Sequence, residues 1–158
     1  MTQGGDVERK IIGVIGGSIA AAEVLRIAEE TGNLIASNGH YLICGGMAGV
    51  MEASAKGARE KGGTTIGILP HTDRHEANPY IDIPIATGVG EGRNLIIVRT
   101  ADLIIAIDGE YGTLSEIAFA LKMGKPVIGL NTWDIKGVIK AGSPVEAISI
   151  AEDILTGT

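Results

Sequence analysis

The chain has 158 residues, of which 45% are hydrophobic and 20% charged, and its formal net charge at pH 7 is −6. This length and apolar content predict one compact, water-soluble domain with a sizeable core. The acidic balance and an aromatic content of 3% exclude a nucleic-acid-binding surface. Such a surface needs clustered Lys and Arg for the phosphates and exposed rings for the bases.

The ends of the chain and its cysteine content indicate the compartment. Residues 1–9 are polar, lack the apolar core of a secretory signal and are expected to form a flexible tail, and residues 10–158 are expected to form the single domain. No run approaches the roughly 18 apolar residues of a membrane-spanning helix. The only cysteine, Cys44, excludes an internal disulfide and is expected to be a small buried residue at a strand end. We therefore expect a cytoplasmic protein.

Apolar runs bounded by glycine and proline predict the strands. In chain order they cover residues 11–15, 41–44, 64–69, 81–85, 103–107 and 127–130. The unbroken apolar run from Leu103 to Ile107 is typical of a parallel strand buried on both faces. Pro84 lacks a backbone N–H and therefore indicates an edge position for its strand.

Helices are predicted between these strands. They cover residues 20–37, 50–61, 93–101, a stretch that starts at the expected N-cap Thr113 and stops before Gly124, and a terminal helix that starts after Ser143. The terminal helix is expected to bury one apolar face, made of Val145, Ile148, Ala151, Ile154 and Leu155. The pattern of residues 93–101 fits a helix or a strand, and we predict a helix because a crossover must precede the parallel strand at 103. The alternation predicts an α/β protein with a three-layer Rossmann-like fold and a doubly wound, mainly parallel sheet.

Three of the predicted strands run into glycine-bearing turns, at residues 16–18, 45–49 and 109–112. In a parallel sheet these turns share the carboxyl edge, and each leaves backbone N–H groups uncovered at the start of a helix, which suits a phosphate. For a single glycine pair, tight turn packing explains the residues equally well. The predicted ligand- and phosphate-binding residues are Gly16, Gly17, Ser18, Gly45, Gly46, Met47, Gly49, Gly109, Glu110, Tyr111, Gly112 and Thr113.

Other motifs are absent or weak. The turn at 16–18 lacks the G-x-G-x-x-G spacing of dinucleotide-binding proteins, and no G-x-x-x-x-G-K-[ST] loop occurs. His71 and His75 have the spacing of a metal-binding pair only if they are helical, whereas prolines bracket a loop here, so no metal site is predicted. The segment 71–92 is expected to form a loop over the crevice, with a mobile lid as an alternative, and Trp133 is expected to be a packing residue.

Several stretches resemble the "Lonely Guy" (LOG) cytokinin-activating phosphoribohydrolases, a family often labelled lysine decarboxylase-like. Its P-G-G-x-G-T-x-x-E signature is similar to residues 108–116, and its G-G-x-x-G-[LV]-M turn is similar to residues 45–51. Arg93 stands at the matching distance before Glu116. The resemblance covers about residues 11–130 and is strongest to a short branch that also resembles molybdenum-cofactor carrier proteins.

The resemblance implies a nucleoside 5′-monophosphate in the crevice, with its phosphate on the turn from Gly109 to Thr113. Arg93 and Glu116 are then the expected catalytic residues at the N-glycosidic bond, because a carboxylate stabilises positive charge on ribose and an arginine holds phosphate or the departing base. No cofactor is required for this hydrolase chemistry. The family also implies a homodimer or a higher homo-oligomer.

This sequence departs from the signature at Asp108, Glu110 and Asn94, which replace a proline, a glycine and a lysine. Two carboxylates therefore flank a turn that would hold an anion, and they repel it by about 1 kcal/mol or more at 4–6 Å. Glu116 itself fits a capping box with Thr113, which is a purely structural role, and Arg93 fits a solvated charge at a helix start. The alternatives to a hydrolase are a non-catalytic carrier or sensor of a phosphorylated ligand such as molybdenum cofactor, and a pure interaction module.

Overall fold

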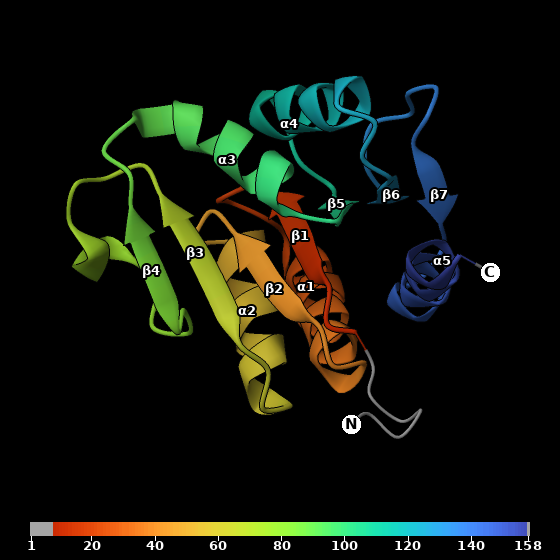
Figure 1. The fold of residues 1–158 in the computed structure, drawn as a ribbon, viewed down its shortest axis with the longest axis horizontal. Helices are drawn as coiled ribbons and strands as arrows, with labels where there is room; N and C mark the ends of the chain where they lie inside the picture. The colour runs from red at the N-terminus through yellow and green to blue at the C-terminus, as the bar shows by residue number, and fades with distance from the viewer. Residues whose placement is uncertain (1–7, 158) are drawn as a thin grey trace.

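A computed structural model of the chain describes residues 8–157, so most of the expected tail, residues 1–7, lies outside the described part. Seven parallel strands form one sheet in the order β4-β3-β2-β1-β5-β6-β7 (Figure 1). They are β1 (Ile11–Gly16), β2 (Tyr41–Cys44), β3 (Thr65–Leu69), β4 (Ile83–Ala86), β5 (Leu103–Ile107), β6 (Val127–Leu130) and β7 (Ile139–Ala141). The chain builds the sheet outward from β1 to β4 and then returns to add β5 beside β1. The direction of winding therefore reverses between β1 and β5, as the doubly wound prediction requires.

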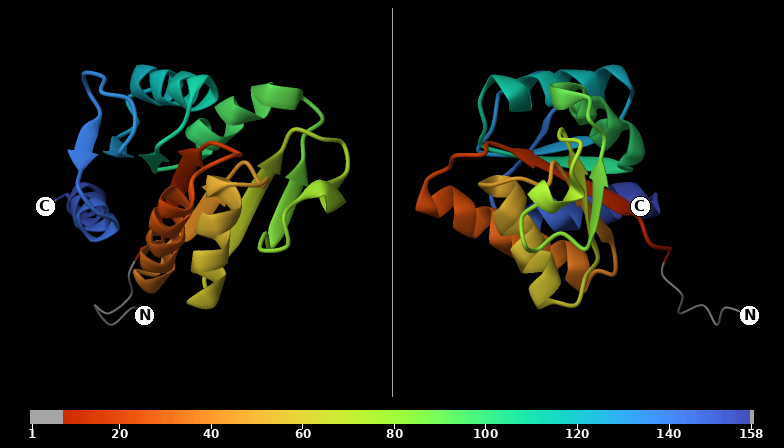
Figure 2. Two further views of the ribbon diagram at one scale, coloured as in Figure 1. Left: turned by 180° about the vertical axis from the view of Figure 1, so that it is seen from behind. Right: turned by 90° about the vertical axis from the view of Figure 1, so that its left-hand side faces the viewer.

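The helices cover both faces of the sheet. They are α1 (Ala22–Ser37), α2 (Val50–Glu60), α3 (Arg93–Thr100), α4 (Tyr111–Lys122) and α5 (Pro144–Thr156), with short 3-10 turns η1 (Arg74–Glu76) and η2 (Gly90–Gly92). Helices α1, α2 and α5 pack on one face, and α3 and α4 on the other, so the sheet is the middle of three layers (Figure 2). The predicted three-layer Rossmann-like fold is confirmed, and so is the helix at 93–101. None of the helices among the described residues combines the length and apolar character needed to cross a bilayer.

Two apolar cores lie on the two faces, and β5 contributes to both. Leu103, Ile105 and Ile107 belong to the core under α1, α2 and α5, while Ile104 and Ala106 belong to the core under α3 and α4. All five side chains are fully or almost fully buried. This alternation follows from the two-residue period of a strand and confirms that 103–107 is buried on both faces.

Helices α1 and α2 touch through their backbones at two glycines. A Cβ on Gly32 would lie 1.9 Å from the Ser54 carbonyl oxygen, and one on Gly57 would lie 1.9 Å from the Glu29 carbonyl oxygen. Asn33 Nδ2 donates to the Gly57 carbonyl oxygen at 2.9 Å, which adds a polar bond across the contact. This contact fixes the first two βα units, and hence their glycine turns, relative to each other.

The structure corrects three details of the sequence analysis. Strand β7 was not predicted, because three residues at a sheet edge carry little apolar pattern. Val145 was expected on the buried face of α5 but is 60% exposed. The strand predicted at 81–85 is at the edge as expected, but it begins at Ile83. Just before it, Asp82 is bonded to Thr65 both through its N–H, at 3.1 Å, and through its carboxylate, at 2.9 Å.

Candidate functional site

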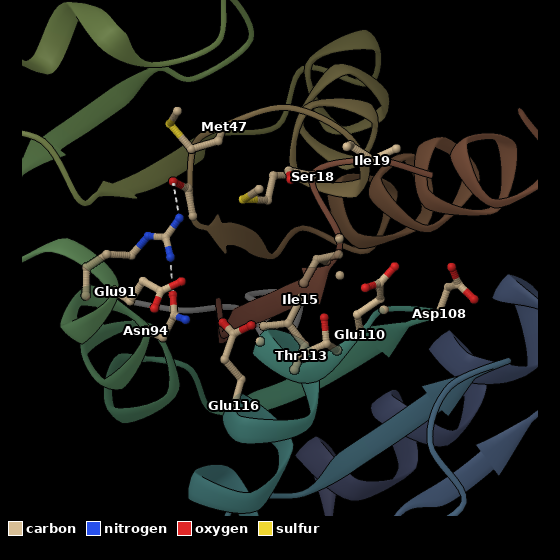
Figure 3. A pocket seen from close by; sticks show the side chains of 18 of the residues that line it. Ile15, Ser18, Ile19, Met47, Glu91, Asn94, Asp108, Glu110, Thr113 and Glu116 are labelled. Carbon is tan, nitrogen blue, oxygen red and sulfur yellow. Dashed lines mark hydrogen bonds between the residues drawn. The ribbon is translucent and has the colours of Figure 1, made fainter. Parts of the chain in front are cut away.

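A cavity of about 500 Å³ opens at the carboxyl edge of the sheet, beside the strand ends β1 and β5 where the winding reverses (Figure 3). All the predicted site residues line it except Gly46, Gly49 and Tyr111. The lining residues that the prediction did not include are Val14, Ile15, Ile19, Met51, Pro70, Glu91, Asn94 and Asp108. Met51 lies in the first turn of α2 and is the last residue of the 45–51 stretch that resembles the LOG turn, a signal that could have indicated it. Pro70 and Glu91 come from the ends of the loop that was expected to pass over the crevice.

The turn after β5 presents the free N-terminus of α4 to this cavity. The helix begins at Tyr111 with Glu110 as its N-cap, and no side chain caps it. The N-cap predicted at Thr113 is therefore wrong: Thr113 lies inside the first turn and is buried, and its Oγ1 occupies the space where a Gly109 Cβ would be, at 2.3 Å. The first-turn N–H groups of an uncapped helix have no partner within the helix, so together with the helix dipole they form a site for an anion.

The first and second glycine turns are joined to each other. The Val50 N–H, at the start of α2, donates to the Gly17 carbonyl oxygen at 3.0 Å. Gly49 has a φ of 68°, and a Cβ there would lie 2.3 Å from the same oxygen. Gly46, with a φ of 75°, packs against Leu69 in a similar way. These two glycines shape the turn and lie outside the cavity lining, so the packing explanation left open for single glycines fits them.

Arg93, at the start of α3, is held against the ends of β2 and β3. Its Nε donates to the Ile68 carbonyl oxygen at 2.9 Å and one terminal nitrogen donates to the Gly45 carbonyl oxygen at 3.5 Å, while the other bonds to Asn94 Oδ1. Burial lowers the pKa of Arg93, and the nearby Glu116 opposes this. The guanidinium is therefore a positioned cation in the cavity wall rather than a solvated charge.

Glu116 lies one helical turn beyond Thr113 on the same side of α4, and its carboxyl group lines the cavity near Thr113 and Asn94 (Figure 3). The residue is 7% exposed, and burial raises its pKa to about 7 although Arg93 pulls it down. Its carboxyl group has no hydrogen-bond or ion-pair partner among residues 8–157. The capping role expected for it is excluded with that of Thr113. A carboxyl group with this pKa exchanges its proton near neutral pH, as general acids and bases do.

Three further carboxylates, those of Glu91, Asp108 and Glu110, also line the cavity. Asp108 has a φ of 50°, in the left-handed region. A proline is locked near −65°, so the proline of the LOG signature does not fit this backbone. At Asp108 this chain therefore differs from the LOG signature in the conformation of the turn as well as in charge.

A doubly wound parallel sheet with a cavity at its switch point, lined by glycine turns and an uncapped helix N-terminus, defines an α/β protein that binds a small molecule. The model of the SLOG cluster4 family matches residues 9–154, and the chain belongs to this family.

Sequence relatives include an archaeal protein and a mycobacterial enzyme. An uncharacterised protein of Archaeoglobus fulgidus is 50% identical over 139 residues, which are 87% of this chain and 91% of that protein. A cytokinin riboside 5′-monophosphate phosphoribohydrolase of Mycobacterium tuberculosis is 34% identical over 121 residues, 71% of this chain but 65% of the enzyme.

Two solved structures of molybdenum-cofactor proteins match this chain over almost their whole length. The molybdenum cofactor binding protein of Rippkaea orientalis is 39% identical with a TM-score of 0.89, covering 95% of this chain and 99% of that one. The molybdenum cofactor carrier protein of Chlamydomonas reinhardtii is 37% identical with a TM-score of 0.84, covering 94% and 99%. The resemblance to LOG-like and carrier proteins is thereby confirmed, and this chain is a LOG-like ligand-binding protein.

Proposed function

We propose that the cavity holds a phosphorylated heterocycle of the molybdenum-cofactor type and that the protein carries this ligand rather than transforming it. The uncapped N-terminus of α4, opening into a 500 Å³ cavity, carries the proposal. Cavities of this size hold small organic ligands, and a helix N-terminus is suited to the phosphate of such a ligand.

The residues present fit such a ligand. In this proposal the N–H groups of Gly112 and Thr113, two residues of the cavity lining, receive the phosphate, and Ile15 and Met51 supply an apolar wall for a flat ring. Thioether and aliphatic side chains suit a heterocycle because they are polarisable and adaptable in shape. The full-length similarity to two molybdenum-cofactor proteins supports the same ligand class.

Analysis of the small molecules that co-purify with the protein tests this proposal. The protein is purified from a host that makes molybdenum cofactor, denatured in acid, and the released material is analysed by mass spectrometry with elemental analysis for molybdenum. We expect a phosphorylated pterin in near-stoichiometric amount. Gly112→Ala is the variant that tests the site, because a methyl group there meets no protein atom within 4 Å and yet lies in the turn that lines the cavity. Its yield of pterin should be strongly reduced, and a pterin-free preparation of the unaltered protein would contradict the proposal.

A second candidate is hydrolysis of purine nucleoside 5′-monophosphates, and the unpartnered Glu116 favours it. A carboxyl group with a pKa of about 7 beside Arg93 can activate water and stabilise a ribosyl cation. Incubation with AMP and with prenylated AMP, followed by an assay for ribose 5-phosphate, measures this activity. Release that is lost in Glu116→Gln would establish the hydrolase, and no release above background would exclude it.

A further inference from the structure

The segment that follows β6 contacts the anion-binding turn through two side chains. Thr132 Oγ1 donates to the Asp108 carbonyl oxygen at 2.6 Å, and Trp133 Nε1 donates to the Glu110 carbonyl oxygen at 3.1 Å. Thr132 and Trp133 themselves do not line the cavity. They therefore hold the turn from outside the site.

These two bonds help to orient the peptide groups whose N–H ends belong to the next residues. The Glu110 carbonyl oxygen also accepts from the Leu114 N–H at 3.0 Å. A trans peptide directs its C=O and its N–H in opposite directions. With the carbonyl oxygens of Asp108 and Glu110 bound to the β6–β7 segment, the N–H groups of Gly109 and Tyr111 point away from it. Neither N–H group donates a hydrogen bond to another atom of residues 8–157, and Gly109 is part of the cavity lining.

The turn needs support because its backbone is strained. Asp108 has a φ of 50° and Asn131, in the supporting segment, has a φ of 52°, both unusual for residues other than glycine. The Asp108 N–H donates to the Leu130 carbonyl oxygen at 3.0 Å, so the two strained segments are joined at three points. The indole of Trp133 is itself oriented by stacking on Tyr111, with ring centroids 5.9 Å apart and planes at 29°.

We propose that Thr132 and Trp133 are positioning residues that hold the turn 108–110 in its ligand-binding conformation. Thr132 and Trp133 act through the backbone of Asp108 and Glu110 and do not touch the ligand. This inference rests on the proposed phosphate site and extends it to a segment that no sequence motif marked.

Three variants test this role: two remove a hydrogen-bond donor to the turn, and the third changes Thr132 but keeps its hydroxyl. Thr132→Val keeps the shape of threonine without the hydroxyl, Trp133→Phe keeps a ring without the N–H, and Thr132→Ser keeps the hydroxyl. Calorimetric titration with AMP should show binding about three- to tenfold weaker for the Val and Phe variants, which is what the loss of one hydrogen bond produces. The Ser variant should bind within about twofold of the unaltered protein. Equal affinity for all four proteins, or a loss in the Ser variant as large as in the Val variant, would overturn the inference.

Amide hydrogen exchange without ligand separates this inference from the proposed function. The amides of Asp108 and Leu114 are hydrogen-bonded at the two ends of the turn, and Ile104, bonded to Pro126 at 2.9 Å in the sheet, is the internal control. Thr132→Val and Trp133→Phe should accelerate exchange at Asp108 and Leu114 while leaving Ile104 unchanged. If the unaltered protein fails to bind AMP, the proposed site is wrong for this ligand, and the exchange result still decides whether the segment holds the turn. Unchanged exchange in both variants would refute the positioning role.

Discussion

At the scale of single residues, Glu116 combines burial with an open side. The cavity gives its carboxyl group access to a ligand, whereas the surrounding protein provides no hydrogen-bond donor among the described residues. Burial therefore favours the neutral acid and raises the pKa of Glu116 from its ordinary value of 4.5 to about 7. Burying the ionised carboxylate of Glu116 therefore lowers the stability of the protein, at a position where the group can exchange a proton with a ligand.

The free energy of unfolding should report this burial directly. Because the folded-state pKa of Glu116 is raised, its contribution to stability is fully present below pH 4.5 and is lost as the pH rises through about 7. A shift of this size corresponds to on the order of 3 kcal/mol. Urea unfolding at pH 5 and pH 8 should therefore show a larger loss of stability for the unaltered protein than for Glu116→Gln. Equal losses in the two proteins would contradict the raised pKa, because they would mean that Glu116 binds no more protons in the folded state than in the unfolded chain at pH 5.

Substitution by alanine should affect stability at one glycine of the α4 turn and ligand binding at another. Gly109 has a φ of 97°, and a Cβ would lie 2.3 Å from Thr113 Oγ1, whereas a Cβ on Gly112 meets nothing within 4 Å. Gly109→Ala should lower the free energy of unfolding by about 1–3 kcal/mol through strain and overpacking. Gly112→Ala should leave stability within about 1 kcal/mol while it weakens AMP binding, because its methyl group shields the N–H groups of the turn. Thermal unfolding and calorimetric titration of both variants measure the two effects.

At the scale of elements, the contact between α1 and α2 places the first two glycine turns. Alanine is normally about 1 kcal/mol better than glycine inside a helix. In Gly57→Ala, however, the new Cβ would lie 1.9 Å from a backbone oxygen of α1, which cannot move without separating the helices. We expect a net loss of about 2 kcal/mol or more in the free energy of unfolding. Gly112→Ala is the matched control for helix propensity, and an unchanged or raised stability of Gly57→Ala in urea unfolding would contradict the close backbone contact.

The start of α4 shows why the pattern T-x-x-E misled the prediction for this element. A capping box requires the threonine to precede the helix, but here the helix starts two residues earlier, at Tyr111. Thr113 packs into the space left by Gly109, and Glu116 turns to the cavity. The related pattern S-x-x-E at residues 143–146 does mark a real N-cap, where Ser143 Oγ accepts from the Glu146 N–H at 3.2 Å. The difference lies in the packing around the turn, which local sequence does not report.

At the scale of the whole molecule, a net charge of −6 opposes the binding of any anionic ligand. Glu91, Asp108 and Glu110 add local repulsion at the cavity, and Arg93 is a cation on its wall. Salt screens such repulsion between exposed charges over about 10 Å at 0.1 M. The affinity for AMP should therefore rise modestly, by about two- to threefold, when the ionic strength increases from 0.01 to 0.15 M. Calorimetric titration at the two salt concentrations checks this, and a steep fall of affinity with salt would show that net positive charge dominates the site.

The sequence alone determined the order of the helices and strands, with the exception of the edge strand β7. Strands such as 103–107 and helices such as 144–156 are marked by local periodicity and by residues that begin or end them, and alternation of the two dictates a doubly wound sheet. The glycine turns could likewise be assigned to one edge, because parallel strands leave no other arrangement. The three glycine turns and the pair Arg93 and Glu116 were thus expected at one cavity, and each of the three turns, like the pair, contributes to its lining.

Only the tertiary structure decided what those residues do there. The burial that raises the pKa of Glu116, the carbonyl oxygens that hold Arg93, and the support of the turn by Thr132 and Trp133 all join segments far apart in the chain. Such effects depend on distance and on exclusion of water, which the order of residues does not state. Local pattern fixes how the backbone folds over a few residues, whereas charge, proton affinity and strain are set by whichever distant groups the fold brings within a few ångströms.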